Sequence, residues 1–328
     1  MKKRAAFGLV ILTLVACAPQ PPATPTPLPP VITPTAIPTF PPALATVPMV
    51  TSTVVETLPP PPTATNTSVP RIANTATSLP PITEMYNPYA VILVSANDVL
   101  NIRTSAGAGN PIVGQLQPTA LGVNRTGPSS SVGVSRWVEI QNPAGGTGWV
   151  NGNFLTEYID RSAFCSDQRA IELLNRLETA MLNSDGELFA SLLSPVHGLD
   201  LRLWRYGTVV NYSPEEALWT FDSDYVVSWG PAPGSGEETR GTFRTQPLPK
   251  LQEVFGSNYG LHCNDTLDLA TFTLVPWPPE YTNINFYTVY KPGTDQYGRL
   301  DWRAWIVGIE YVRDQPTLFA LIHFQWEP

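Results

Sequence analysis

The sequence contains little of what most enzymes need for their chemistry. Only three of its 328 residues are histidines and three are cysteines. Apart from the adjacent His262 and Cys263, these residues show no metal-ligand spacing, so we expect no metal site and no cofactor. The sequence has no HExxH motif, no Gly-x-Ser-x-Gly motif and no Gly-rich phosphate loop. The best-known motifs of metalloproteases, serine hydrolases and nucleotide-binding enzymes are therefore absent.

Positive charge is also scarce. The chain has 19 Lys and Arg against 27 Asp and Glu, a net charge of −8. Residues 163–328 carry 11 basic and 21 acidic side chains, a balance of −10, whereas residues 89–158 balance three arginines with three acids. Because no basic stripe is present, we expect no nucleic acid partner. The acidity also disfavours anionic polymers as ligands.

Long apolar runs are missing as well. The clearest one, Phe7–Val15, follows the basic residues 2–4 and is shorter than the ~20 residues of a membrane-spanning helix. This layout is typical of a secretory signal. The segment Leu14-Val15-Ala16-Cys17 resembles the lipobox of bacterial lipoproteins, in which the chain is cut before the cysteine and the cysteine is lipidated. The resemblance predicts a signal peptide over residues 1–17 and an extracytoplasmic protein anchored to the membrane through Cys17. The alternative is an ordinary secreted protein with an incidental cysteine.

Two cysteines remain if Cys17 is lipidated. Cys165 and Cys263 form an even pair, which in an exported chain suggests a disulfide. In the chain-entropy model a loop of nearly a hundred residues contributes ~4–5 kcal/mol to stability. The alternative is two unpaired buried thiols.

Proline and threonine dominate residues 18–88. This stretch holds 20 of the 36 prolines and 15 threonines, with only three charged residues. Such a segment has too little apolar volume to offset the entropy of ordering, and proline favours the extended polyproline conformation. We therefore expect a disordered Pro/Thr-rich stalk that holds a folded head away from the membrane. Proline-rich ligand motifs are the alternative use of this stretch.

The composition changes at Tyr89. About five short β-rich runs, separated by Gly, Asn and Pro, predict a small all-β barrel over residues 89–158. The matching segments are 99–103 (VLNIR), 112–116 (IVGQL), 137–140 (WVEI) and 148–150 (GWV), closing on residues 154–155. They resemble the bacterial SH3 (SH3b) family, whose members are typically non-catalytic and bind cell-wall peptides or proteins.

That resemblance implies candidate binding residues around the barrel and its loops. They are Asn101, Arg103, Trp137 and Trp149. Amphipathic aromatic residues are common at interfaces but are equally common in cores. The alternative is that Asn101 and Arg103 stabilise the first long loop and that Trp149 belongs to the core.

Residues 162–328 predict an α+β domain with N-terminal helices and a curved antiparallel sheet. A helix is expected over 167–183 with Ser166 as its N-cap, then a second over 185–193. Ser213, with Glu216 three residues later, predicts a capping box at a third helix. The order of these elements is loosely similar to the nuclear-transport-factor-2-like fold, whose members are enzymes in some cases and binding or assembly proteins in others.

The last three predicted strands form a meander with two apolar faces. Alternation puts Leu318, Ala320 and Ile322 on one face of the last strand, with Phe319, Leu321 and His323 on the other. If the sheet curls around a cavity, Arg303, Trp305 and His323 would line it as candidate binding residues. Asp301 and Glu310 could then assist His323 as a general base. The plainer interpretation is a buried histidine satisfied by a neighbour.

These expectations define a multidomain surface protein. It would be a non-catalytic binding protein, recognising cell-wall peptide (peptidoglycan), glycan or an envelope protein through its SH3b and C-terminal domains. The alternatives are an exported cell-envelope hydrolase that the SH3b module targets to its substrate, and an assembly factor of an envelope complex. The seven tryptophans after residue 160 could also stack on sugar rings, although scattered tryptophans are more often core.

Overall fold

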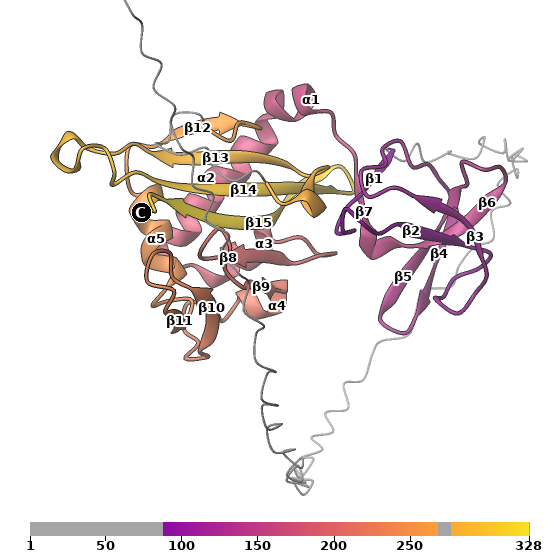
Figure 1. Cartoon of the computed structure of the whole chain (residues 1–328), viewed down its shortest axis with the longest axis horizontal. Helices are drawn as coiled ribbons and strands as arrows, with labels where there is room; N and C mark the ends of the chain where they lie inside the picture. The colour runs from indigo at the N-terminus through magenta and orange to yellow at the C-terminus, as the bar shows by residue number, and fades with distance from the viewer. Residues whose placement is uncertain (1–87, 268–276, 328) are drawn as a thin grey trace, which may run out of the picture. The chain divides into compact units, whose positions relative to one another are not determined.

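A computed structural model describes residues 88–267 and 277–327 (Figure 1). Cys17, the predicted signal peptide and all but the last residue of the predicted stalk lie outside the described residues. The described residues all belong to one compact unit. They are mostly β-structure, with a curled sheet and few helices. No described helix has the length and apolar character needed to cross a membrane.

The first part of the described chain forms a five-stranded sheet. Its strands, in sheet order, are β3 (Ile112–Leu116), β2 (Leu100–Arg103), β6 (Thr147–Asn151), β5 (Ser135–Gln141) and β4 (Arg125–Val132). Every neighbouring pair is antiparallel. Alternate residues such as Ile102, Val138 and Val150 are buried in one hydrophobic cluster. The period-two pattern therefore gives this sheet one core face and one outer face.

The second sheet has eight strands. Its main path runs β1 (Tyr89–Val91), β7 (Leu155–Glu157), β14 (Arg303–Val312), β15 (Gln315–Gln325), β8 (Leu199–Arg202) and β9 (Val209–Tyr212); β13 (Asn285–Lys291) pairs with β14, and β12 (Gly260–Cys263) with β13. The predicted meander β13–β14–β15 is present and antiparallel. The expected all-antiparallel sheet is wrong at one place, because β8 pairs in parallel with β15. The long connection between β8 and β15 allows this crossover pairing.

The eight-stranded sheet also extends across the predicted boundary between residues 158 and 162. Strand β1 pairs with β7, and Glu157 of β7 pairs with Tyr311 of β14. The first and last strands of the predicted barrel segment are thus hydrogen-bonded into the same sheet as the C-terminal meander. Hydrophobic periodicity cannot reveal this, because it identifies strands but not their partners.

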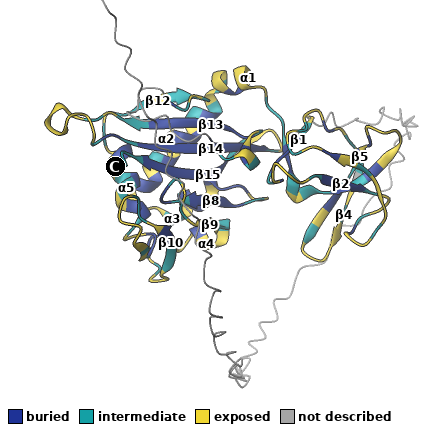
Figure 2. Cartoon of the chain, viewed as in Figure 1, coloured by how far each residue is buried: buried dark blue, intermediate teal, exposed yellow. Residues whose placement is uncertain are grey.

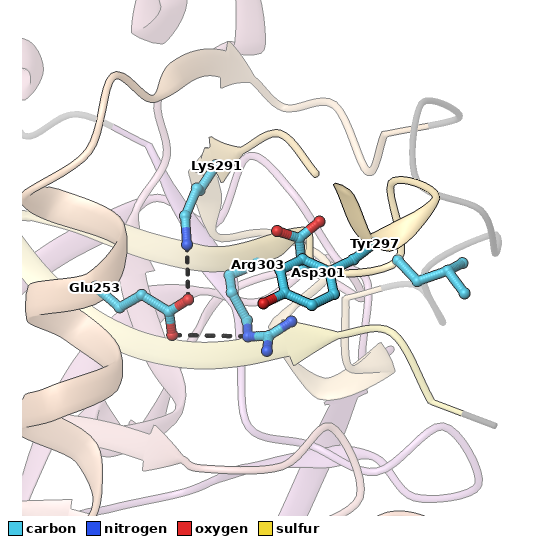
Figure 3. Close-up of a pocket in the computed structure, with 6 residues that line it drawn as sticks. Glu253, Lys291, Tyr297, Asp301 and Arg303 are labelled. Atoms are coloured by element: carbon cyan, nitrogen blue, oxygen red, sulfur yellow. Dashed lines mark hydrogen bonds and ion pairs between the residues drawn. The ribbon is translucent and has the colours of Figure 1, made fainter. Parts of the chain in front are cut away.

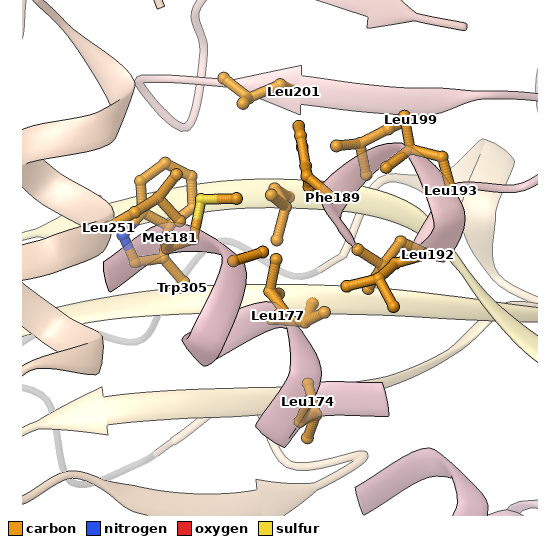
Figure 4. Close-up of a cluster of buried hydrophobic side chains, with 14 of the residues drawn as sticks. Leu174, Leu177, Met181, Phe189, Leu192, Leu193, Leu199, Leu201, Leu251 and Trp305 are labelled. Atoms are coloured by element: carbon orange, nitrogen blue, oxygen red, sulfur yellow. The ribbon is translucent and has the colours of Figure 1, made fainter. Parts of the chain in front are cut away.

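Helices cover one face of this sheet. They are α1 (Arg161–Ser166), α2 (Gln168–Asn183), α3 (Gly186–Leu192), α4 (Pro214–Ala217) and α5 (Pro247–Phe255). Leu174, Leu177 and Met181 of α2 lie in the same cluster as Trp305 of β14 (Figure 4). Their spacing of three and four residues keeps them on one side of the helix, as the sequence predicts.

Two helix starts illustrate how local sequence sets the fold. The N-cap of α2 is Asp167, whose carboxylate accepts from the Arg169 amide, rather than the expected Ser166. The Ser166 hydroxyl instead donates to carbonyls of the preceding turn, in α1. At α4 the predicted capping box is present, with Ser213 and Glu216 each bonding the other's backbone amide.

The meander is buried on both faces (Figure 2). Trp305, Val307 and Leu321 face the helices, whereas Ile306 and Ile322 belong to a second cluster on the opposite side. The predicted alternation of β15 is wrong at Leu318 and Phe319. The pairing of β14 with β15 skips Phe319, so this bulge puts Leu318 on the helix side and Phe319 on the other.

The remaining elements are short. A two-stranded ribbon consists of β10 (Val227–Pro231) and β11 (Glu238–Gly241). Three 3₁₀ turns are η1 (Gly152–Phe154), η2 (Pro279–Tyr281) and η3 (Asp295–Tyr297). The predicted disulfide is present between Cys165 of α1 and Cys263 of β12, with Cα atoms 5.7 Å apart. It joins the end of α1 to the edge of the eight-stranded sheet.

Candidate functional site

The outer face of the five-stranded sheet gathers the binding residues predicted for residues 89–158. Arg103 lies directly opposite Trp149, and Trp149 lies opposite Glu139 in the next pairing. Residues that pair across strands share a face, and so do residues two apart on one strand. Asn101 and Trp137 therefore lie on the same face as Arg103 and Trp149, opposite the core.

The four residues differ in how much of them a ligand could reach. Asn101, Arg103 and Trp149 are half-buried, whereas Trp137 is only 6% exposed. Arg103 donates from Nη1 to the Asn110 carbonyl at 2.6 Å, which fixes its guanidinium over the loop 104–111. Asn101 accepts from the Gln115 side chain. These residues thus offer an aromatic ring, a cation and an amide, and the half-buried carboxylate of Glu139 on the same face accepts from the hydroxyls of Thr126 and Thr147.

A second candidate site is an open cleft of about 610 Å³ beside the β13–β14 connection. It is lined by Glu253, Lys291, Tyr297, Leu300, Asp301 and Arg303. Lys291 Nζ lies 2.7 Å from Glu253 Oε1, and Arg303 Nε lies 3.7 Å from Glu253 Oε2. Figure 3 shows both cations pointing toward this one carboxylate. Tyr297 is 59% exposed and offers an aromatic surface at the rim.

The charges of the cleft balance within its lining. Two cations, Lys291 and Arg303, face two carboxylates, Glu253 and Asp301. Asp301 accepts from the backbone amide and hydroxyl of Thr294, and these bonds lower the pKa of its carboxyl. The cleft therefore presents both hydrogen-bond donors and acceptors without a strong net field. Such a lining suits a ligand that is itself rich in donors and acceptors.

Trp305 and His323, predicted with Arg303 to line a cavity, lie inside the core. Trp305 is 0% and His323 1% exposed, and their rings are 4.9 Å apart. Arg303 alone of the three reaches the cleft. Alternation along β14 points Arg303 and Trp305 toward the same side, but α5 covers Trp305, whose indole donates to the Lys250 carbonyl.

The side chains expected to assist His323 are spread over the sheet. Asp301 is bonded to Thr294 in the cleft, and Glu310 lies in β14 beside a different histidine. His323 Nδ1 is 3.2 Å from the Leu203 carbonyl, while its Nε2 has no hydrogen-bond partner among the described residues. Burial, followed by the charges of Lys250 and Arg303, holds the pKa of His323 well below its usual value. His323 is thus a neutral, sealed side chain.

The partner of Glu310 is His197, which the sequence analysis did not single out. His197 Nδ1 lies 2.8 Å from both carboxylate oxygens of Glu310, and the two side chains are 6% and 1% exposed. Thr156 also donates to Glu310, at 3.1 Å. A lone carboxylate in the apolar run of β14 was the available signal, because a buried acid requires a partner. The identity of that partner depends on the fold.

The tryptophans after residue 160 do not assemble a stacking surface in the described residues. Trp229, Trp302 and Trp305 are at most 1% exposed, and Trp204 and Trp277 are 9% exposed. Only Trp219, at 68%, presents most of its ring to solvent, and Trp326 is half-buried. In this module the tryptophans are therefore mainly core residues, the alternative that the sequence left open.

Within residues 88–267 and 277–327, no group of three or more His, Cys, Asp or Glu side chains is placed so that it could hold a metal ion. The resemblances to the SH3b family and to the nuclear-transport-factor-2-like fold stay predictions. No protein-family model, no curated protein and no solved structure matches this chain.

Proposed function

We propose that this chain is a lipid-anchored, extracytoplasmic binding protein without catalytic activity. Its ligand would be cell-wall peptide, glycan or a protein partner of the envelope. The outer face of the five-stranded sheet would make the first contact and the cleft at Arg303 the second. The Pro/Thr-rich residues 18–88 would separate these surfaces from the membrane.

The observation that carries the proposal is the strand register of the five-stranded sheet. It puts Asn101, Arg103 and Trp149 side by side on a half-exposed face. A ring with a polar edge, next to a cation and an amide, can bury apolar surface and satisfy polar groups of a ligand together. Aromatic residues and arginine are also the types enriched at recognition surfaces.

The extracytoplasmic location is supported by two independent features. The segment Leu14–Cys17 has the lipobox pattern, and lipid chains on a cysteine give stable anchoring when two or more are attached. The disulfide between Cys165 and Cys263 fits an oxidising compartment outside the cytoplasm.

The non-catalytic part of the proposal rests on where the reactive side chains lie. Of the three histidines, His197 and His323 have nearly inaccessible side chains, whereas His262 is half-buried. Ser194, a hydroxyl that could act as a nucleophile, is 0% exposed and accepts from the Val196 and His197 amides. A general base must reach the proton that it abstracts. Buried groups with internal partners favour a structural role.

Binding is tested by retention of the full chain on purified cell wall and on its separated glycan and peptide fractions. We expect the double variant Arg103→Ala, Trp149→Ala to lose at least about tenfold in affinity, since hot-spot residues contribute ~1–2 kcal/mol each. Arg303→Ala, Tyr297→Ala should give a smaller loss. Arg244→Ala is the matched control, because Arg244 is an exposed arginine that pairs with Asp224 elsewhere on the surface.

Equal retention of the wild type and both double variants would contradict the proposed binding surfaces. Release of soluble wall fragments by the wild-type chain would contradict the absence of catalysis. The anchor is tested separately by metabolic labelling with palmitate, which we expect to label the wild type but not Cys17→Ser. An unlabelled wild type would leave a secreted protein and remove the membrane from the proposal.

A further inference from the structure

The buried pair His197–Glu310 lies where the segment 153–157 meets the helix-covered sheet. His197 belongs to the turn before β8, and Glu310 belongs to β14. The other contacts of this pair come from the end of the first module. His197 Nε2 lies 3.1 Å from the Asn153 carbonyl, and Thr156 Oγ1 donates to Glu310 Oε2. One imidazole therefore connects a carboxylate of the sheet with the backbone of residue 153.

Counting hydrogen atoms fixes the protonation of this pair. The Asn153 carbonyl can only accept, so Nε2 of His197 must carry a proton. An ionised Glu310 can also only accept, so Nδ1 must carry a second proton or share one with the carboxylate. Both bonds exist together only when the pair holds this extra proton. The arrangement is a charge-assisted bond, which is roughly twice as strong as a neutral one.

The charged and titratable groups around His197 support this state. Glu310 faces it from β14, Asp200 faces it from β8, and the ring of Phe319 packs against it from β15. Asn153 and Thr156 contribute only uncharged groups. Burial opposes protonation, but the Glu310 carboxylate, the Asn153 carbonyl and Asp200 hold the pKa of His197 above its usual value of 6.5.

We propose that His197 and Glu310 form a proton-dependent clasp that fastens residues 153–157 to the helix-covered sheet and opens as the pH becomes alkaline. Loss of the shared proton leaves one N–H for two acceptors. We expect the remaining ring N–H to be on Nδ1 and to donate to Glu310, because a charged acceptor forms a stronger hydrogen bond than a carbonyl. Nε2 then presents a lone pair to the Asn153 carbonyl, and this bond to the first module is lost.

The remaining bonds between the two parts do not depend on this proton. Asn283 donates to the Val91 carbonyl, Leu93 donates to the Glu280 carbonyl, and Glu157 accepts from the amides of residues 313 and 314. Opening of the clasp therefore loosens residues 153–157 without separating the parts.

Amide hydrogen exchange of the full chain tests the clasp. After correction for the intrinsic effect of pH on exchange, we expect protection of residues 152–157 to fall as the pH rises from about 6 to about 9, because the bond to the Asn153 carbonyl is lost together with the proton. His197→Gln should remove this pH dependence, since glutamine cannot take the extra proton. His323→Gln, a change at the other buried histidine, should keep it.

Unchanged protection of residues 152–157 in the wild type across this pH range would overturn the clasp. So would an unaltered pH dependence in His197→Gln. If that variant does not fold, the imidazole nitrogen shifts of His197 in the wild type decide the question. A ring that loses its second proton only above 6.5 supports the clasp, and a ring that loses it below 6.5 contradicts it.

Discussion

Two buried histidines, His197 in the turn before β8 and His323 in β15, have opposite surroundings. His197 is held between Glu310 and the Asn153 carbonyl, with Asp200 nearby. His323 lies near Lys250 and Arg303, and its Nε2 has no partner among the described residues. Both side chains are nearly inaccessible. Burial alone favours the neutral form of each ring, so the neighbouring charges decide which one is protonated.

The two histidines therefore have different structural roles, since His197 makes a bond between distant segments and His323 packs in the core. The extra proton of His197 makes a bond between distant parts of the chain, from residue 153 to residue 310. His323 uses its ring to pack against Trp305 and Trp204. His323, which lies near cations, thus behaves as an aromatic core residue that makes one hydrogen bond to the backbone. A buried histidine near carboxylates acts as a cation.

Removal of the disulfide should give the largest loss in the free energy of unfolding. It tests whether the different protonation states of the two histidines depend on global stability. Replacing Cys165 and Cys263 by alanine removes a link across 98 residues and should lower the free energy of unfolding by about 4–5 kcal/mol. Denaturant titration measures the loss. The difference between the histidines should survive in the folded variant, and its disappearance would mean that charge neighbours are not its cause.

The next effect comes from removing the partner of each histidine in turn. Glu310→Ala leaves a buried imidazole without its carboxylate and should cost about 3–5 kcal/mol at about pH 6. Lys250→Ala removes a repulsive neighbour of His323 and a contact with the Trp204 ring, with a net change within about 1 kcal/mol. Comparable losses in the two variants would contradict the account, and denaturant titration separates these outcomes.

The two histidines should make opposite contributions to the slope of the free energy of unfolding against pH. The raised pKa of His197 gives stability that is complete below 6.5 and lost as the pH rises through the folded pKa. The lowered pKa of His323 gives stability that is complete above 6.5 and lost as the pH falls toward its folded pKa. We expect His197→Gln to flatten the alkaline slope and His323→Gln to flatten the acid slope, each by up to about 1.4 kcal/mol per pH unit.

Thermal unfolding over a range of pH measures both slopes. The acid slope of His323 can be distinguished from that of Asp167, whose pKa is lowered to about 2 by the hydrogen bonds from Arg169. Asp167 loses its contribution only below its ordinary value of 3.8. A wild-type chain whose stability is constant between about pH 6 and about pH 9 would refute the assignment of His197.

The smallest effect concerns the cleft. Arg303→Ala removes one of the two cations that lower the pKa of His323. The side chain of Arg303 is 25% exposed and its ion pair with Glu253 is long, so we expect a stability change of less than about 1 kcal/mol. The pKa of His323 should move toward its usual value, as measured by ring carbon shifts. No movement would mean that Arg303 does not contribute to the lowered pKa of His323.

Much of the fold follows from patterns within short segments. The meander, helix α2, the Ser213 capping box and the disulfide pair were all predicted from spacing, capping residues and cysteine number. These features depend on residues close in sequence, or on a count. The first sheet likewise follows from the alternation that buries Ile102 and Val150.

Most of the features that sequence reasoning missed depend on how strands pair, whereas the N-cap of α2 was missed by one residue. The parallel pairing of β8 with β15 and the pairing of β7 with β14 join segments more than a hundred residues apart. The bulge at Phe319 reverses the faces of two residues without any local signal. Glu310 was expected near His323 because both lie in the meander, yet the fold brings it to His197 from another segment.

Burial, helped by the cations Lys250 and Arg303, keeps His323 neutral, whereas the carboxylate of Glu310 and its neighbours keep the buried His197 protonated. Nuclear magnetic resonance of the imidazole rings in the full chain, followed from about pH 5 to about pH 9, distinguishes these two protonation states. We expect His197 to titrate above 6.5 and His323 well below 6.5. Titration of both rings at 6.5, or a protonated His323 together with a neutral His197 at about pH 6, would contradict this expectation.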